Sequence, residues 1–426
     1  MNKKIGNLFK GDKGIWTVFF FLCLISIIEV FSASSTLSYK SHNYMGPIIY
    51  HAGTLLAGIV ITIVTLNIPC RYFKLVTPLF LILSFATLLW VLAFGESVNG
   101  ANRVIQLPGF TFQPSELAKG TMVLATAQIL SAMQLEDGSG ADSKAMKYVL
   151  WLVLPTVALI GVENLSTAVL LFGVIFIMMF FGRVPLVQLG KLTGILVLIV
   201  GVFVALVLTL GKDSREDEEA IVSTEMVATE VQPAVADAED GMVNKVFHRF
   251  TTWRNRLLNH TSRPDDPNDF SVKDNFQVAH SHFAIASSGI IGKGPGNSVE
   301  RDYLPQAFSD FIFSIIIEEL GLIGAIVVVF LYVILLFRSA RIAGHCENNF
   351  PAFLVMGLSI LLVAQACINM MVAVDIGPVT GQPLPLVSKG GTSTLVSCAY
   401  IGAILSVSRS AKKLQTSKKV VTIESE

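Results

Sequence analysis

Three carboxyl groups lie inside or beside an apolar run that begins with AFSDFIFSIIIEEL at residues 307–320 and is long enough to cross a bilayer. Charged side chains are costly at membrane depth, so they line a cavity, pair with a cation or take part in chemistry. At about 100° per residue, one stripe of the predicted helix holds Asp310, Ser314, Glu318 and Gly321. Glu319 lies off this stripe. We expect the stripe to face a bundle interior or a water-filled cleft.

Asp310 stands at the expected mouth of this helix, where its carboxylate is placed to accept a proton from a substrate hydroxyl. Glu318 lies about 12 Å further along at the usual helical rise, too deep to meet the same polar substrate. We therefore interpret Glu318 as the buried partner of a cation such as Lys119. The sequence assigns no role to Glu319.

A second pair of ionisable groups lies in FQPSELAK, residues 112–119. Pro114 suits the first position of a helix, and Glu116 lies in the first turn, where the helix dipole favours an anion. Glu116 and Lys119 are three residues apart and share one face. Two interpretations stay open: the pair neutralises itself at the membrane interface, or the charges line a cavity that receives substrate.

Membrane-spanning helices must position these residues. Of the 426 residues, 53% are hydrophobic and 15% charged, and the mean hydropathy of +0.64 is too high for a soluble chain. We predict an all-α polytopic membrane protein with about ten spans of ~17–25 residues. The spans centre near residues 15–32, 50–68, 75–95, 115–133, 148–162, 165–182, 190–210, 310–337, 351–373 and 391–408. The fifth and sixth meet at GVENLS and could be separate, merged or re-entrant.

Lys and Arg residues set the expected orientation of these spans. They concentrate in the segments that an N-inside arrangement leaves in the cytoplasm, and the short outside loops hold only Lys40, Arg103 and Lys389. Both termini are therefore predicted to be cytoplasmic, with an even number of spans. The first span lacks a small-residue cleavage site, so we do not interpret it as a removable signal peptide.

Three polar islands fall on the predicted outer face, which indicates that function faces outward. Two are short: GESVNGANRVIQLPGFTFQPSELAK, and DIGPVTGQPLPLVSKGGTS, whose PLPLVSKGGTS either lines a cavity or forms a plain re-entrant cap. The third is a large extracytoplasmic loop between the seventh and eighth spans, with an acidic, disordered insert predicted at 212–240. The predicted parts are 1–211 with spans one to seven, the loop 212–309, 310–410 with spans eight to ten, and a cytoplasmic tail, 411–426.

Several classes of function are disfavoured. The formal net charge is zero and no basic stripe is present, so nucleic acid is not expected as a partner. The five cysteines have no paired spacing that predicts a disulfide or a metal cluster. GIIGKGPGNS has neither a preceding strand nor a following GK[ST], which argues against a nucleotide-phosphate loop and leaves a turn or a close approach to substrate. His280 and His282 have no third ligand in register for zinc.

Three long segments resemble the SEDS family, the shape, elongation, division and sporulation proteins that include FtsW, RodA and SpoVE. They are NGANRVIQLPGFTFQPSELAK, GKGPGNSVERDYLPQAFSDFIFSIIIEELG and QACINMMVAVDIGPVTGQPLPLVSKGG, in the family's order and membrane positions. The resemblance runs from about residue 31 to residue 410, apart from the acidic insert. The GPGNSV segment is similar to the division-type members, FtsW and SpoVE, more than to RodA.

The resemblance implies a ten-span glycosyltransferase that polymerises lipid II on the outer face of the bacterial cytoplasmic (inner) membrane for the septal wall. Its implied partners are a class B penicillin-binding transpeptidase and other divisome membrane proteins. Asp310 matches the family's catalytic aspartate. Arg103, Glu116 and Lys119 match residues that line the family's cavity. Residues in or beside matching segments are Gln277, Ser388 and Lys389.

The expected reaction is attack of the acceptor's GlcNAc 4-hydroxyl on the anomeric carbon of the donor strand, with Asp310 as the base. Polyprenyl pyrophosphate is already a good leaving group, so a second carboxylic acid is not required. Cations or a divalent metal, Mg²⁺ or Mn²⁺, are expected to stabilise the pyrophosphate charge. The candidate cations, with Arg103 first, are Arg103, Lys119, Lys293 and Lys389.

The sequence departs from the family pattern in four places. Val104 replaces a frequent Trp, ENLSTA at 163–168 replaces P-D-L-G-T, Phe308-Ser309 replace His-Thr, and Lys389 replaces Tyr. None of these changes removes the expected base. The alternatives are a lipid II flippase using the same cavity and the intramembrane Glu318, a non-enzymatic divisome scaffold, and a RodA-type elongation polymerase. Asp310 at the rim favours the enzyme, because a flippase should keep its key charges nearer the midplane.

Overall fold

The structure, a computed structural model, describes residues 10–33, 46–98, 101–107, 110–136, 140–210, 276–304 and 307–424. Within these ranges, ten long helices follow the order of the predicted spans: α2 (Lys13–Ala33), α4 (Gly46–Asn67), α5 (Cys70–Phe94), α6 (Pro114–Ala132), α7 (Ala145–Glu163), α8 (Leu165–Phe181), α9 (Leu186–Leu210), α13 (Ile312–Gly344), α14 (Asn349–Ala373) and α15 (Gly391–Glu424). Eight of them are long and apolar enough to cross a membrane; α6 and α8 are not among the eight. The polytopic helical class is confirmed, and the number of ten spans stays a prediction.

The chain divides into two compact units, Met1–Gln188 with Phe276–Glu426, and Leu189–Asn275. The second unit contains most of α9. The predicted acidic insert 212–240 lies outside the described residues, as does the rest of the loop up to residue 275. The four-part division predicted from the sequence therefore stays a prediction.

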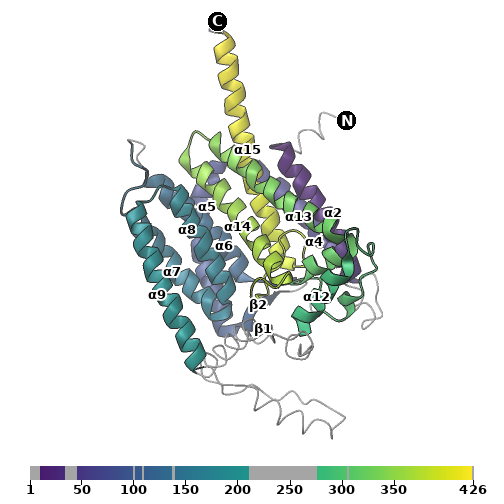
Figure 1. Cartoon of the computed structure of the whole chain (residues 1–426). Helices are drawn as coiled ribbons and strands as arrows, with labels where there is room; N and C mark the ends of the chain where they lie inside the picture. Colours follow the sequence, from purple (N-terminus) through teal and green to yellow (C-terminus); the bar gives the residue numbers. More distant parts are fainter. Residues whose placement is uncertain are drawn as a thin grey trace. The chain divides into compact units, whose positions relative to one another are not determined.

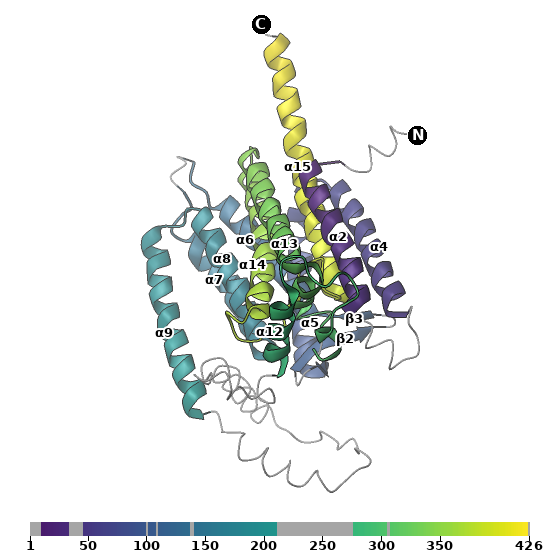
Figure 2. The ribbon, with the colours of Figure 1, turned by 45° about the vertical axis from the view of Figure 1, so that its right-hand side comes forward.

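In the first unit, α14 lies at the centre of the helix bundle and packs against α6, α8, α13 and α15. On one side of the bundle, α2, α4 and α15 lie side by side (Figures 1 and 2). The beginning of α2 and the C-terminal end of α15 lie at the same end of the bundle (Figure 1). The small sheet and α12 (Phe276–Ser288) lie toward the other end.

A three-stranded antiparallel sheet forms part of the first predicted polar island. Its strands are β1 (Glu96–Val98), β2 (Ala101–Leu107) and β3 (Phe110–Phe112), in the order β1-β2-β3. The Thr392 hydroxyl at the start of α15 donates to the carbonyl of Thr111 at 2.5 Å and accepts from the amide of Gln113 at 3.2 Å. The sheet is thereby attached to the beginnings of α6 and α15.

The fifth and sixth predicted spans, which could have been separate, merged or re-entrant, are two separate helices, α7 and α8. Asn164 adopts an extended backbone between them, and its side-chain oxygen accepts from the amide of Thr167 at 3.2 Å. This is an N-cap, which satisfies an otherwise unpaired amide in the first turn of α8. The ENLSTA segment therefore serves as a helix boundary.

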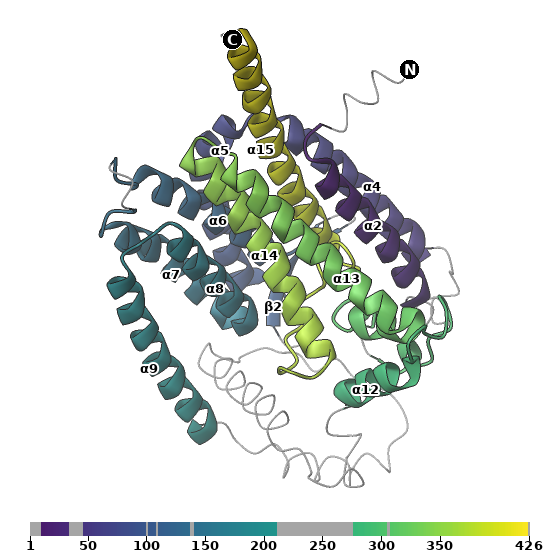
Figure 3. The same ribbon diagram turned by 45° about the horizontal axis from the view of Figure 1, so that its top comes forward.

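The predicted continuous eighth span is interrupted, because α13 breaks at Gly321, where φ is 70° and ψ is −170°. The residues that follow, 322–344, extend about 34 Å at helical rise, enough to cross a bilayer by themselves. The broken end lies beside α12 (Figure 3). The stretch that carries Glu318 and Glu319 is thus a short half-helix before the break. Of the predicted stripe, Ser314 and Glu318 lie buried in this half-helix, whereas Asp310 precedes it in a turn and Gly321 is the break itself.

A glycine loop, residues 289–299, fills the break in α13. The carbonyls of Gly289 and Ile290 accept from the amides of Leu322 and Ile323 at 3.3 Å each. In return, the carbonyls of Glu318 and Glu319 accept from the amides of residues 293 and 294 at 2.9 and 2.8 Å. The loop thus satisfies the main-chain groups that a broken helix leaves unpaired.

Candidate functional site

Asp310 lies two residues before the first turn of α13 and is partly exposed. The Ser309 hydroxyl donates to its Oδ1 at 3.0 Å, and Asn369 Nδ2 of α14 donates to its main-chain oxygen at 2.8 Å. The main chain that carries the carboxylate is therefore fixed to the central helix of the bundle, while the side chain keeps access to solvent.

The α14–α15 loop, residues 374–390, runs directly past Asp310. The Ser388 hydroxyl donates to the main-chain oxygen of Ser309 at 2.6 Å, and the Lys389 amide donates to that of Phe308 at 2.9 Å. Lys389 Nζ lies 4.9 Å from the centre of the Phe308 ring, a cation–π contact. Burial lowers the pKa of Lys389 below that of an ordinary lysine. The structure thus brings Ser388 and Lys389 to the two residues that precede Asp310.

Buried side chains from several helices hold the α14–α15 loop in place. Tyr332 of α13 donates to the carbonyl of Pro385 at 2.5 Å, and Ser26 of α2 donates to that of Val387 at 2.7 Å. Leu386 adopts a φ of 66°, which a non-glycine residue keeps only where its surroundings fix the backbone. The PLPLVSKGGTS segment is thus a fixed loop held among the helices, and its role in lining a cavity stays a prediction.

Sequence reasoning missed two amide side chains of α14, Gln365 and Asn369, which lie one helical turn apart. Gln365 Nε2 donates to the carbonyl of Pro383 at 3.1 Å. Asn369 Nδ2 donates to Gln382 at 2.8 Å, besides its bond to Asp310. Their i, i+4 spacing inside an otherwise apolar helix was the available signal, because it places both amides on one face.

Glu116 and Lys119 form a buried ion pair. Lys119 Nζ lies 2.8 Å from Glu116 Oε1 and also donates to Gln365 Oε1 at 2.7 Å. Lys119 has no exposed surface and Glu116 is 3% exposed. The pair therefore neutralises itself in the bundle, and substrate contact would require these bonds to break.

Glu318 pairs with Lys293 of the glycine loop, with 2.6 Å between Nζ and Oε1. The expectation that Glu318 is the partner of Lys119 is therefore wrong, because the break in α13 lets the loop reach Glu318. Its carboxylate also accepts from the amides of Val299 and Glu300 at 3.0 and 3.3 Å and from the hydroxyl of Ser298. The charge of Lys293, a candidate for the pyrophosphate, is already compensated by this carboxylate.

Glu319, which the sequence left without a role, anchors the same loop. Its carboxylate accepts from the amides of Gly296 and Ser298 at 2.9 and 3.2 Å and from the hydroxyl of Ser32 in α2. Arg301 Nη1 lies 3.9 Å from Glu319 Oε1 and donates to Ser32 Oγ at 2.8 Å. Both glutamates are fully buried, so their function in this structure is to hold the loop to the break.

The remaining predicted site residues lie elsewhere. Arg103 is in β2, but its side chain lies outside the described part of the structure. Gln277 is in the first turn of α12, partly buried. His280 and His282 contact different carboxylates: His280 Nδ1 lies 2.6 Å from Glu300, and His282 Nε2 lies 3.2 Å from Asp375. In the described ranges, no three His, Cys, Asp or Glu residues gather to hold a metal.

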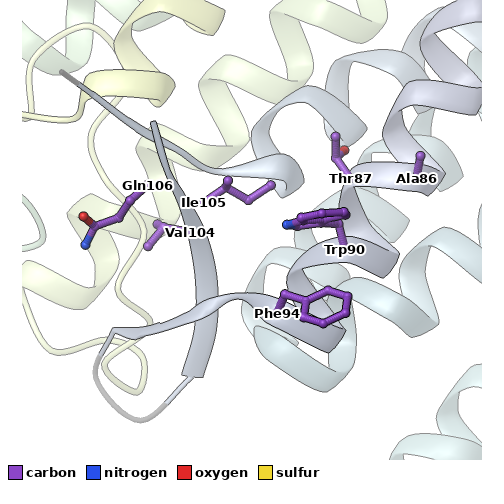
Figure 4. A pocket seen from close by; sticks show the side chains of 7 residues that line it. All are labelled: Ala86, Thr87, Trp90, Phe94, Val104, Ile105 and Gln106. Atoms are coloured by element: carbon purple, nitrogen blue, oxygen red, sulfur yellow. The ribbon is translucent and has the colours of Figure 1, made fainter. Parts of the chain in front are cut away.

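An open pocket of about 650 Å³ lies between the last turns of α5 and β2 (Figure 4). It is lined by Ala86, Thr87, Trp90, Phe94, Val104, Ile105 and Gln106. Ala86, Trp90 and Phe94 repeat every four residues and so share one face of α5. The Trp90 and Phe94 rings lie 5.2 Å apart. The walls are mainly apolar, and such a pocket suits an apolar chain.

The geometry around Asp310 supports acid–base chemistry on a substrate that also carries negative charge. The carboxylate of Asp310 lies on a fixed main chain. Lys389, whose pKa is lowered by burial, lies on the adjacent α14–α15 loop. A carboxylate can take a proton from a hydroxyl, and a nearby ammonium can stabilise an anion that develops in the transition state.

Comparison with known proteins places the chain in a protein family. The model of the FtsW/RodA/SpoVE family, described as cell cycle protein, matches residues 12–217 and 222–413. A probable peptidoglycan glycosyltransferase FtsW from Geobacter sp. (strain M18) is 30% identical over 91% of this chain and 94% of its own. The peptidoglycan glycosyltransferase MrdB of Escherichia coli (strain K12) is 27% identical over 86% of each chain.

Solved structures with the same fold are also known. A chain from a peptidoglycan synthase complex that coordinates polymerisation and crosslinking has a TM-score of 0.66, with 22% identity over 94% of this chain and 98% of its own. The rod shape determining protein RodA of Thermus thermophilus has a TM-score of 0.60, with 21% identity over 95% and 98%.

Proposed function

Since the chain belongs to the FtsW/RodA/SpoVE family of cell cycle proteins, we propose that it is a peptidoglycan glycosyltransferase of the FtsW type. It polymerises lipid II into glycan strands for the septal cell wall, as the names of its FtsW relatives indicate. The observation that carries the catalytic assignment is Asp310, a partly exposed carboxylate whose main chain is fixed by α14 and whose neighbour in space is the Lys389 segment.

Asp310 acts as the general base. Its carboxylate accepts the proton of the acceptor's GlcNAc 4-hydroxyl as that oxygen forms a bond with the anomeric carbon of the donor strand. The bond from that carbon to the polyprenyl pyrophosphate breaks, and the pyrophosphate leaves with the electron pair. Because this group leaves readily as an anion, one carboxylate is enough, in contrast to the paired carboxylates of glycoside hydrolases.

Lys389 and Arg103 are the cations we assign to the pyrophosphate. Lys389 is supported by its contact with Phe308, two residues before Asp310, whereas Arg103 is supported by its motif alone. Lys119 and Lys293 lose this assignment, because each is paired with a buried glutamate. A divalent cation such as Mg²⁺ or Mn²⁺ would be carried by the substrate's phosphates, since Mg²⁺ commonly binds through phosphates with few carboxylates.

The lipid nature of the substrate accounts for the pocket at α5. Trp90 and Phe94 offer aromatic surface to a polyprenyl chain, and β2, which forms the opposite wall, also carries Arg103. We assign the pocket to the part of the polyprenyl chain nearest the pyrophosphate. Substrate thus reaches the protein from the membrane, and its sugars reach Asp310 at the same end of the bundle.

The protein is a multi-pass membrane protein, and we place it in the bacterial inner membrane with both termini in the cytoplasm. The Lys and Arg distribution supports this orientation, which places Asp310 on the extracytoplasmic face of the membrane.

A class B penicillin-binding transpeptidase is the proposed partner, with other divisome membrane proteins. The solved complex that coordinates polymerisation and crosslinking supports a partner of this type.

A polymerisation assay with labelled lipid II tests the function. Purified wild-type protein with its transpeptidase partner should give glycan ladders, and Asp310→Asn should abolish them while the variant stays folded and partner-bound. Persistent ladders in Asp310→Asn would disprove the base assignment. If the wild type makes no ladders but moves lipid II across liposomes, the protein is a flippase.

A complementation experiment separates the two types of relative. An FtsW-type protein should restore division to cells that lack their division polymerase, whereas an MrdB-type protein should restore elongation to cells that lack their elongation polymerase.

A further inference from the structure

The side chain of Asn369 joins the segment that carries Asp310 to the α14–α15 loop. Its Nδ2 donates to the main-chain oxygens of Asp310 and Gln382, each at 2.8 Å. An amide nitrogen carries two hydrogens, and both are used here. Asn369 is 1% exposed, so water does not compete for either bond.

Hydrogen-bond chemistry fixes the orientation of this amide. Asn369 Oδ1 is buried and accepts no hydrogen bond from the residues that the structure describes. Turning the amide over would set Oδ1 against two carbonyl oxygens and leave the nitrogen without acceptors, which is unfavourable. Asn369 therefore presents its two donors, rather than its oxygen, to the Asp310 segment.

The segment that Asn369 holds has little regular structure of its own. Residues 307–311 form turns before the first helical residue of α13, Ile312. Side chains bind two consecutive carbonyls of this segment: Ser388 donates to Ser309, and Asn369 donates to Asp310. The place of the Asp310 carboxylate thus depends on tertiary hydrogen bonds from α14 and the α14–α15 loop.

We propose that Asn369 is a positioning residue for glycosyl transfer, which fixes the Asp310 main chain and the α14–α15 loop relative to each other. The inference rests on the proposed function with Asp310 as the base. Asn369 acts through the Asp310 main chain and does not bind substrate. Its loss should therefore lower kcat with little change in KM, because a displacement of about 1 Å can cost on the order of 100-fold in rate.

The test measures initial rates of glycan synthesis against lipid II concentration for the full-length protein with its partner. Asn369→Leu has a similar volume without donors, and Asn369→Asp has the same shape with an acceptor in place of the donors. Ser359→Ala is the matched control, since Ser359 is buried in the same helix and its hydroxyl donates to Met356, one turn earlier in that helix. Thermal unfolding of each purified variant reports on the fold.

We expect both Asn369 variants to lose on the order of 10- to 100-fold in kcat, with KM within about twofold and Ser359→Ala equal to the wild type. Asn369→Gln, which keeps the amide donors, should recover part of the loss. A folded Asn369→Leu with wild-type kcat would overturn the proposal, and so would variants that all fail to fold, since residue 369 would then be purely structural. An inactive wild type would instead refute the proposed function.

Discussion

Lys293 and Glu318 form an ion pair, with 2.6 Å between Nζ and Oε1, that closes the glycine loop over the break in α13. Glu318 has no exposed surface, and the Lys293 side chain is 28% exposed. The pair lies between two segments that are 25 residues apart in the chain. It therefore links the loop to the half-helix that follows Asp310.

Removing one partner of this pair should destabilise the protein. Lys293→Met leaves the buried Glu318 carboxylate without its cation, at a cost of about 3 kcal/mol in the free energy of unfolding. Lys293→Met/Glu318→Gln should recover part of this loss. Chemical or thermal unfolding in detergent measures both, with Glu347→Gln, an exposed carboxylate, as the control. A wild-type midpoint for Lys293→Met would contradict the pairing.

A methyl group at Gly321 should disturb the break itself. A Cβ there would lie 2.3 Å from the carbonyl oxygen of Ile290, and the φ of 70° is unfavourable for other residues. Gly321→Ala should therefore lower stability by more than the ~1–2 kcal/mol that left-handed backbone alone costs.

Gly289→Ala separates these two effects, since Gly289 has a φ of 64° and open space around its Cβ position. Thermal midpoints should fall in the order wild type, Gly289→Ala, Gly321→Ala. Equal midpoints for the two variants would show that the close approach of the glycine loop to Gly321 does not matter.

Lys119→Met should lower stability more than any surface lysine variant, because it strands the buried Glu116 carboxylate. The expected loss is about 3–5 kcal/mol. Lys119→Met/Glu116→Gln should restore most of it. Unfolding curves for both, with Lys74→Met on the surface as control, check this. Loss of glycan synthesis by Lys119→Met at an unchanged midpoint would point to substrate contact instead.

The fall in kcat/KM at high pH should depend on the ionisation of Lys389. Burial lowers its pKa, so the ammonium loses its charge at a lower pH than an ordinary lysine does, and pyrophosphate stabilisation is lost as pH rises through that pKa. Lys389→Arg keeps its charge over the whole range. The alkaline fall in kcat/KM should therefore move to higher pH in Lys389→Arg and be absent from an already slow Lys389→Met. Superimposable profiles for wild type and Lys389→Arg would exclude this role.

Local patterns in the sequence were sufficient for the helices, because span length and apolarity act within one segment. The ten predicted spans correspond to ten described helices. Asp310 was chosen as the candidate base from its place before an apolar helix, together with the resemblance of its motif to the SEDS family. The sheet of β1–β3 was missed, since strands this short draw their stability from the neighbouring α5, α6 and α15 rather than from their own pattern.

The stretch AFSDFIFSIIIEEL shows what the sequence determines by itself and what only the tertiary structure determines. The sequence by itself determined that Asp310 precedes an apolar helix and that two glutamates follow within it. Only the tertiary structure decided that the helix breaks at Gly321, that Lys293 and the glycine loop take up Glu318 and Glu319, and that Asn369 holds Asp310. The physical reason is that hydrophobic periodicity is local, whereas the partner of a buried charge or carbonyl comes from whichever distant segment the packing brings within hydrogen-bond distance.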